Sequence, residues 1–222
     1  MAKELNIVTL NVPYPPDYGG MIDSYYRIKW LKEAGVKIHL HCFQYGRPES
    51  KELESFCDTV HYYKRQRTLL NFFSNLPYII TSRSSFQLLE NLKSNDYPIL
   101  FDGLHTTYYL NHPDLAGRKK FLRAHNIEHL YYKSLAYFEN NLAKKLYFLF
   151  ESRKLQKYER RSGSVNLLTI SEYDYNYFAQ FNKSTVLLLP FHQFNDVISL
   201  KGSGKYRSEE RRVGKECRYR WS

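Results

Sequence analysis

The sequence predicts an α/β protein with a doubly wound, mostly parallel sheet of the Rossmann-like type. Short apolar segments alternate along the chain with longer segments of helical periodicity. Most of the apolar segments are hydrophobic throughout rather than at every second residue, as expected for strands buried on both faces. Helical segments rather than tight turns separate most of these strands, and parallel strands require such crossovers.

The first part of the chain predicts one strand followed by an amphipathic helix. Residues 5–12 form the strand, which the prolines of "VPYPP" end because proline lacks an N–H donor. Gly35 stands where a helix C-terminus favours a left-handed residue. Apolar residues recur three apart along the helix: Ile22, Tyr25, Ile28, Leu31 and Ala34.

The remaining elements continue the alternation. We expect helical pieces at 50–57, on both sides of Pro77 within 68–95, over 172–181, and in one continuous stretch from Glu128 to about Arg161. Further strands are predicted at 36–43, 59–64, 98–104, 120–125, 165–171 and 185–191.

Composition favours a cytoplasmic protein with an anionic partner. The 222 residues include 33 basic and 22 acidic ones, which gives a net charge of +11. The basic residues are dispersed and no RNA- or DNA-binding signature is present, so we expect no nucleic-acid partner. The three cysteines form no CxxC pair, which gives no sign of a zinc site or disulfide framework. No run of 18 apolar residues occurs, and the N-terminus is a poor signal peptide.

The last residues are interpreted as foreign to the fold. Residues 207–222, "RSEERRVGKECRYRWS", follow a linker-like "KGSGKY" and resemble a translated sequencing adapter. Without their six basic and three acidic residues the net charge falls from +11 to +8. We therefore expect a domain over 1–200, a linker and artefactual tail over 201–222, and a longer natural protein. The alternative is a natural basic tail that binds an anion.

The loop "PYPPDYGG" is a candidate ligand site. It lies at the predicted carboxyl end of the first strand and leads into a helix N-terminus, where backbone N–H groups and the helix dipole favour phosphate. Gly19 and Gly20 would let a ligand approach the backbone closely. The loop matches neither GxGxxG nor the P-loop pattern, and a plain turn is the alternative.

Four blocks in order resemble the N-terminal domain of retaining GT-B glycosyltransferases of the family-4 type. They are the strand–"PYPPDYGG"–helix–"VKIHLHCF" segment, "LFDGLH", "FLRAHNIEHLYY" and "LLTISEYDYNYF". The resemblance implies an acceptor-binding half. A second half would hold the nucleotide-sugar, usually with an E-x7-E motif that this sequence lacks. It also implies sugar transfer to a saccharide or lipid-linked acceptor in polysaccharide or glycolipid biosynthesis, without a metal or other cofactor. This chain alone would be inactive.

The resemblance also assigns roles to individual residues. It places the backbone of Gly19 and Gly20 near the donor diphosphate or the reacting sugar. It places His125 near the reacting sugar as the candidate catalytic residue, with a structural histidine as the alternative. Asn126 is a further candidate for substrate binding, or else begins the next helix. Ser171 matches the "S-x-x-D" that opens a late helix, and its hydroxyl also suits an N-cap.

Two more candidates follow from their place at strand ends. Asp102 and His105 lie at the end of the strand in "LFDGLH", where they would line the acceptor pocket or serve the loop itself. "HNIEH" also matches a zinc-protease pattern, but that chemistry needs both histidines on one helix, whereas His125 follows a predicted strand.

Two alternatives concern partners. The segment 143–161 is a basic helix with an apolar face, which predicts either contact with an anionic membrane or ordinary packing on the sheet. The alternative to a transferase is a self-contained Rossmann-like module that binds a nucleotide or anion without catalysis.

Overall fold

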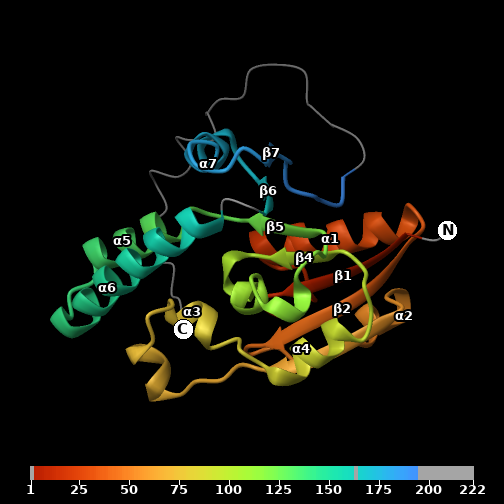
Figure 1. The fold of residues 1–222 in the computed structure, drawn as a ribbon, viewed down its shortest axis with the longest axis horizontal. Coiled ribbons are helices and arrows are strands. Elements are labelled where there is room, and N and C mark those ends of the chain that lie inside the picture. Colours follow the sequence, from red (N-terminus) through yellow and green to blue (C-terminus); the bar gives the residue numbers. More distant parts are fainter. Residues whose placement is uncertain (1–2, 163–164, 195–222) are drawn as a thin grey trace, which may run out of the picture. The chain divides into compact units, whose positions relative to one another are not determined.

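The computed structural model describes residues 3–162 and 165–194, which contain a single parallel sheet (Figure 1). Its seven strands follow the order β3-β2-β1-β4-β5-β6-β7, and each neighbouring pair is parallel. This confirms the predicted fold class. The strands are β1 (Lys3–Thr9), β2 (Val36–Gln44), β3 (Thr59–Lys64), β4 (Ile99–Asp102), β5 (Lys120–Ala124), β6 (Asn166–Thr169) and β7 (Thr185–Leu187).

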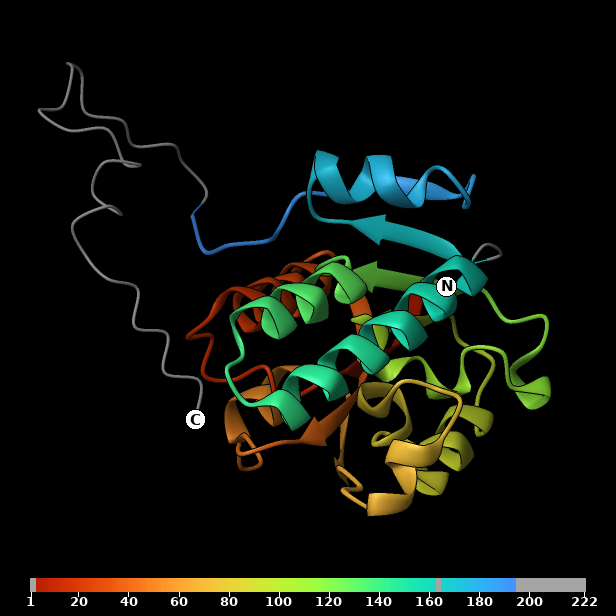
Figure 2. The same ribbon diagram turned by 90° about the vertical axis from the view of Figure 1, so that its left-hand side faces the viewer.

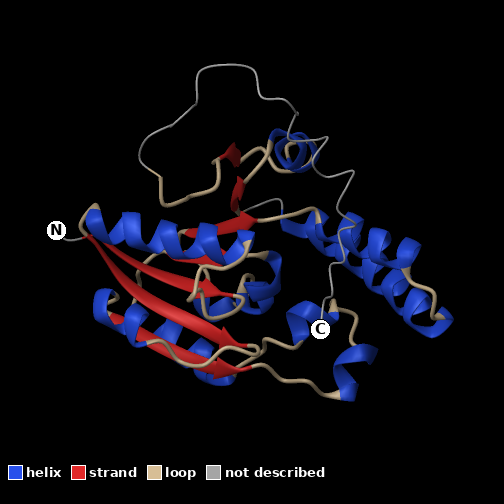
Figure 3. Cartoon of the chain, turned by 180° about the vertical axis from the view of Figure 1, so that it is seen from behind, coloured by secondary structure: helices blue, strands red, loops and turns tan. Residues whose placement is uncertain are grey.

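Helices cover both faces of the sheet (Figure 3). They are α1 (Gly19–Glu33), α2 (Lys51–Phe56), α3 (Tyr78–Thr81), α4 (Phe86–Lys93), α5 (Glu128–Phe138), α6 (Leu142–Glu159) and α7 (Glu172–Phe178). Short 3₁₀ segments are η1 (Leu69–Phe73), η2 (Leu104–Tyr109), η3 (Pro113–Leu115) and η4 (Arg160–Ser162).

The core consists of two apolar layers because successive residues of a strand point to opposite faces. Ile7 of β1 packs with Tyr25 and Ile28 of α1 on one face. Val8 packs on the other face, in a layer to which α3, α4, α5 and α6 all contribute. Burial on both faces explains why these strands are hydrophobic throughout.

The first strand ends at Thr9, three residues earlier than predicted. Asn11 turns the chain there. Its Oδ1 accepts hydrogen bonds from the N–H groups of Val12 (2.9 Å) and Tyr45 (3.1 Å), and its Nδ2 donates to the Tyr45 carbonyl oxygen (3.0 Å). An amide side chain thus replaces strand pairing before the prolines begin.

The prediction of one continuous helix from Glu128 to Arg161 is wrong. The segment forms two helices, α5 and α6, which pack against each other as a hairpin (Figure 2). Asn141 begins α6, since its Oδ1 accepts a hydrogen bond from the Lys144 N–H at 3.1 Å. Phe138 and Leu142 at the hairpin turn are 78% and 69% exposed. Membrane contact by 143–161 stays a prediction.

Helix α1 buries more polar residues than its apolar spacing predicts. Tyr25 and Ile28 are buried as expected, but Ala34 is exposed. Asp23 and Arg27 are not among the apolar residues predicted to face the core, yet both are buried at 2% exposure. Their burial requires charged partners, which the functional site supplies.

Two further features are the lack of a membrane-spanning helix among the described residues and the division of the chain into two units. Within the part of the chain that the structure describes, no helix has the length and apolarity needed to cross a membrane. One compact unit extends to His192, and residues from Gln193 onward form a second unit, of which 193–194 are described. Residues 207–222, which the sequence analysis interprets as an artefactual tail, lie outside the described residues.

Candidate functional site

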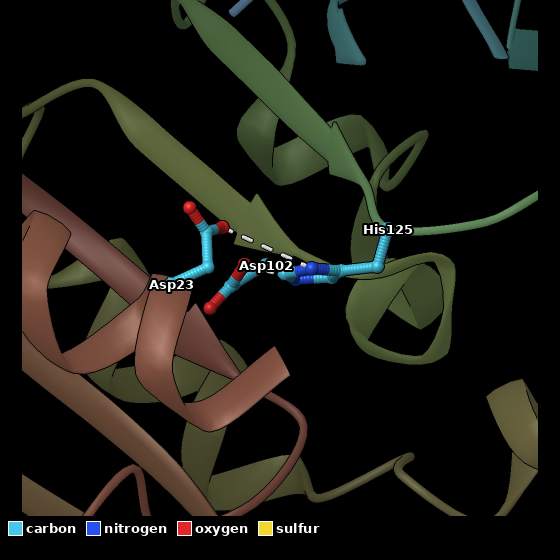
Figure 4. Close-up of side chains that lie close together, drawn as sticks. All are labelled: Asp23, Asp102 and His125. Carbon is cyan, nitrogen blue, oxygen red and sulfur yellow. Dashed lines mark hydrogen bonds and ion pairs between the residues drawn. The ribbon is translucent and has the colours of Figure 1, made fainter. Parts of the chain in front are cut away.

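Three polar side chains meet where β4 and β5 end (Figure 4). Asp102 is the last residue of β4, His125 directly follows β5, and Asp23 lies in α1. His125 Nε2 is 2.7 Å from Asp102 Oδ1, and its Nδ1 is 3.8 Å from Asp23 Oδ2. The histidine side chain is 10% exposed and the two carboxylates are buried.

Asp102 holds its charge inside the protein. Burial alone would raise its pKa, but the neighbouring Arg27 and His125, together with hydrogen bonds from His125 and Ser24, lower the pKa below its usual range. Arg27 Nη2 lies 2.6 Å from Asp102 Oδ2, and the Ser24 hydroxyl contacts the same oxygen. An ionised Asp102 fixes the orientation of the His125 ring.

Two buried arginines balance the two carboxylates. Arg27 also reaches Asp23 Oδ2 at 2.6 Å through Nη1. Arg123, from the middle of β5, forms a two-pronged contact with Asp23, with Nε 3.1 Å from Oδ2 and Nη2 3.0 Å from Oδ1. The result is a chain of alternating charges from Arg123 through Asp23 and Arg27 to Asp102.

The segment after β7 is attached to this network. Arg123 donates hydrogen bonds to the carbonyl oxygens of Leu188 (2.5 Å) and Leu189 (3.2 Å). The Phe191 N–H donates to Asp23 Oδ1 at 2.8 Å. The network therefore joins β5, α1 and the segment that follows the last strand.

Asp23, Asp102 and His125 have ligand atoms within 4.8 Å of one another, a spacing that a metal ion could use. The donor set does not fit one. Each of the four carboxylate oxygens already contacts an N–H or O–H donor, and two guanidinium groups supply the positive charge. A metal ion would have to displace Arg27 or Arg123 from a buried ion pair.

One nitrogen of His125 remains for a ligand. Its Nδ1 lies beyond hydrogen-bond range of Asp23, and no described residue forms a hydrogen bond with it. With Nε2–H donated to Asp102, the neutral ring offers Nδ1 as an acceptor and the protonated ring offers it as a donor. His125 can therefore exchange a proton or hold an oxygen atom at this edge of the sheet.

Gly19 and Gly20 form the first turn of α1. Neither has a positive φ, and a Cβ at Gly19 would meet no atom within 4 Å, so the fold itself does not require glycine there. Tyr18, the N-cap, makes no side-chain hydrogen bond to the helix. The Ser24 hydroxyl lies 2.8 Å from the Gly20 carbonyl oxygen and contacts Asp102, which links this turn to the site. A ligand role for the two glycines stays a prediction.

His105 lies beside His125. Gly103 separates them with φ +88°, and a Cβ there would lie 3.5 Å from His105 Nδ1 and 3.6 Å from His125 Cδ2. Burial and the nearby Arg83 and Arg65 lower the pKa of His105 well below its usual range. Its Nδ1 is 3.8 Å from Glu128 Oε1, too far for a hydrogen bond.

The other predicted residues take two positions. Asn126 and Asp174 line a hollow of about 620 Å³ between α5 and α7. Ser171 caps α7, since its Oγ accepts from the Asp174 N–H at 3.1 Å and contacts the Asp174 carboxylate. This confirms its N-cap role, and substrate binding by Ser171 and Asn126 stays a prediction. Direct binding of sugar hydroxyls by Asp102 also stays a prediction, and its contacts add a second role in holding His125.

The two histidines of "HNIEH" do not share a helix. His125 follows β5, whereas His129 lies in α5 with its Nδ1 2.6 Å from Glu159 Oε2. The zinc-protease pattern therefore lacks the geometry it needs, as the predicted strand indicated.

Sequence reasoning missed Asp23, Arg27 and Arg123. An Asp–Arg pair four apart within an amphipathic helix was one available signal, because such a pair can neutralise itself. A single arginine inside the apolar strand "KFLRA" was the other, since an unpaired charge is not buried there.

No family model matches the chain. It is 30% identical over 181 residues to an uncharacterized 44.6 kDa protein in the cps region of Klebsiella pneumoniae. The match covers 78% of this chain and 46% of that protein. The chain thus spans about half the length of the curated relative that it matches.

Proposed function

We propose that the chain is the acceptor-side part of a GT-B glycosyltransferase that acts in capsule or related polysaccharide synthesis. The complete enzyme transfers a sugar from a nucleotide-sugar to a saccharide or lipid-linked acceptor at the cytoplasmic side. The observation that carries the proposal is His125, which Asp102 holds at 2.7 Å while Nδ1 forms no hydrogen bond with a described residue. The relative from a cps region supports the biosynthetic setting.

His125 is suited to the reacting group. When the ring carries a proton on each nitrogen, its Nδ1–H would donate to a departing phosphate oxygen or to a hydroxyl of the transferred sugar. Because Asp102 is fixed by Arg27, the ring does not need to reorient during the reaction.

The start of α1 is suited to the departing diphosphate. Its first turn contains Gly19 and Gly20 and no acidic residue, and the N-cap side chain accepts no hydrogen bond from the first N–H groups of the helix. Backbone donors in fixed positions stabilise a developing anion without reorganisation. In this proposal the nucleotide itself is bound chiefly by a part of the protein beyond this chain.

A chromosomal His125→Ala allele in the organism that carries the gene tests the proposal. We expect loss of one surface polysaccharide, or accumulation of a saccharide carrier that lacks one sugar, measured by mass spectrometry of extracted lipids. The control is His112→Ala, which removes a histidine outside the site.

The purified full-length protein that the source locus encodes provides the second readout. Incubation with nucleotide-sugars and the lipid extract of the mutant should release nucleoside diphosphate as the missing sugar is added. A deletion of the gene that leaves all surface saccharides unchanged would contradict the proposal. Tight nucleotide binding by the 222-residue chain alone would favour the binding module.

A further inference from the structure

Three arginines and a histidine form a second cluster next to the site. The basic cluster consists of Arg65 and Arg67 after β3, Arg83 after α3 and His105 after β4. Arg65, Arg67 and His105 follow strands at the carboxyl edge of the sheet, where ligands of such folds bind, and Arg83 reaches this edge through its hydrogen bond to Leu10, the residue after β1. His105 connects the cluster to His125 across Gly103.

The protein places Arg65 and Arg83 beside each other. The Gln66 N–H donates to the Ser82 carbonyl oxygen at 2.8 Å, and Arg65 Nε donates to the Ser82 hydroxyl at 2.9 Å. Both bonds tie the loop after β3 to the turn that contains Arg83. These hydrogen bonds hold the two positive charges of Arg65 and Arg83 close together.

Arg83 is built into the interior. It is 2% exposed, its Nη1 donates to the Ile79 carbonyl oxygen at 2.8 Å and its Nε to the Leu10 carbonyl oxygen at 3.2 Å. No described residue accepts a hydrogen bond from its Nη2. Burial and the nearby Arg65 lower the pKa of Arg83 to about 9, so it remains charged at neutral pH.

Aromatic rings hold the other two arginines. The guanidinium carbons of Arg65 and Arg67 lie 4.8 and 4.6 Å from the centre of the Tyr45 ring, and Arg65 also lies 5.6 Å from that of Tyr78. Stacking fixes a guanidinium while leaving its N–H donors free for a ligand.

The cluster has no matching negative charge. Among the described residues no carboxylate lies within 4.0 Å of Arg65, Arg67 or Arg83. Two buried acids lie on this side. Glu151 is paired with Lys154 at 2.8 Å, and burial raises the pKa of Glu128 to about 8, so Glu128 is mostly neutral at pH 7. His105 Nδ1 is buried and has no hydrogen-bond partner among the described residues.

We propose that the basic cluster of Arg65, Arg67, Arg83 and His105 binds the anionic group of a ligand, a phosphate or a carboxylate. The buried Arg83 and the unpartnered His105 Nδ1 would contact its oxygens, and the two stacked arginines would close over it. That the anion belongs to the acceptor, as the phosphate of a lipid-linked saccharide or the carboxylate of an acidic sugar, rests on the proposed function. Anion binding itself does not.

Calorimetric titration of the 222-residue chain with pyrophosphate and, separately, with glucuronate tests the proposal. We expect binding of at least one, with Arg65→Gln and Arg67→Gln each weakening it about three- to tenfold. Arg153→Gln is the matched control, because Arg153 is an exposed arginine of α6 outside the cluster, and it should change the affinity less than twofold. Circular dichroism confirms that each variant is folded.

Each outcome decides the proposal. Preference for pyrophosphate indicates a phosphorylated ligand and preference for glucuronate an acidic sugar, and both support the cluster. Absence of binding by the unchanged chain, or binding that both cluster variants leave intact, overturns it. Anion binding is measured on the 222-residue chain and transfer on the full-length enzyme, so failure of the proposed function and failure of this inference are separate results.

Discussion

Asp23 is the residue on which the buried charges of the site depend. It contacts Arg27, Arg123 and the Phe191 N–H, whereas Asp102 contacts only the first of these. Removing it leaves Arg27 with Asp102 as its partner and leaves the buried Arg123 with no carboxylate among the described residues. An unpaired buried charge is among the most costly defects in a folded protein.

Asp23→Asn is therefore expected to lower the free energy of unfolding by about 3–5 kcal/mol. Urea denaturation measures the loss, with Asp96→Asn as the control because Asp96 is exposed and changes the net charge equally. A value for Asp23→Asn within about 0.5 kcal/mol of the control, the range of surface substitutions, would mean that the network contributes little.

Glu128 makes the stability of the protein fall as the pH rises. Burial and the nearby Glu159 raise its pKa to about 8 from an ordinary value of 4.5. Other groups that face it are Arg83, His105 and Tyr131. Between these two pH values the native state keeps a proton that the unfolded chain releases. The contribution of Glu128 to stability is thus complete below about pH 4.5 and is lost as the pH rises through 8.

Glu128→Gln should consequently gain stability relative to the unchanged protein as the pH rises from 5 towards 8, by about 1 kcal/mol or more. Urea unfolding at several pH values measures the difference, and the exposed Glu49→Gln should show no such trend. A difference that is constant with pH would show that Glu128 is ionised in the native state.

At the scale of elements, the order and type of the strands could be predicted because each was a separate apolar segment. The boundaries were less predictable. Asn11 ends β1 through bonds to Tyr45, a residue 34 positions away, which local sequence does not reveal. Asn141 divides the predicted long helix, and this signal was present, since asparagine is a favoured N-cap.

Asn141→Ala is expected to destabilise the protein by about 1 kcal/mol, because the first N–H groups of α6 lose their acceptor. Thermal or urea unfolding measures this effect. Asn140→Ala is the matched control, as Asn140 is exposed and precedes the cap. Equal losses in the two variants would assign the effect to the hairpin turn rather than to the cap.

The part of the candidate site that lies at strand ends could be predicted from the sequence, and the part that depends on long-range contacts could not. His125 and Asp102 stand at strand ends, where parallel topology brings side chains together. Arg27, Arg123 and the basic cluster depend on which face each element buries and on pairing between loops such as 65–67 and 82–84. Those contacts join residues distant in sequence, and helical periodicity assigns α1 only an apolar face.

At the scale of the whole molecule, the relative from Klebsiella pneumoniae indicates what to test, because the match covers 46% of its length. A transferase needs a second group of residues for the nucleotide-sugar. We therefore expect the source locus to continue in frame past Tyr206 into a second α/β region of ~200 residues, the size of a large domain, with an E-x7-E pair. Sequencing genomic DNA across the codons for Tyr206 and Arg207 decides this. If the locus instead encodes "RSEERRVGKECRYRWS" and a stop codon, no second half exists, and the binding module becomes the better explanation of the site.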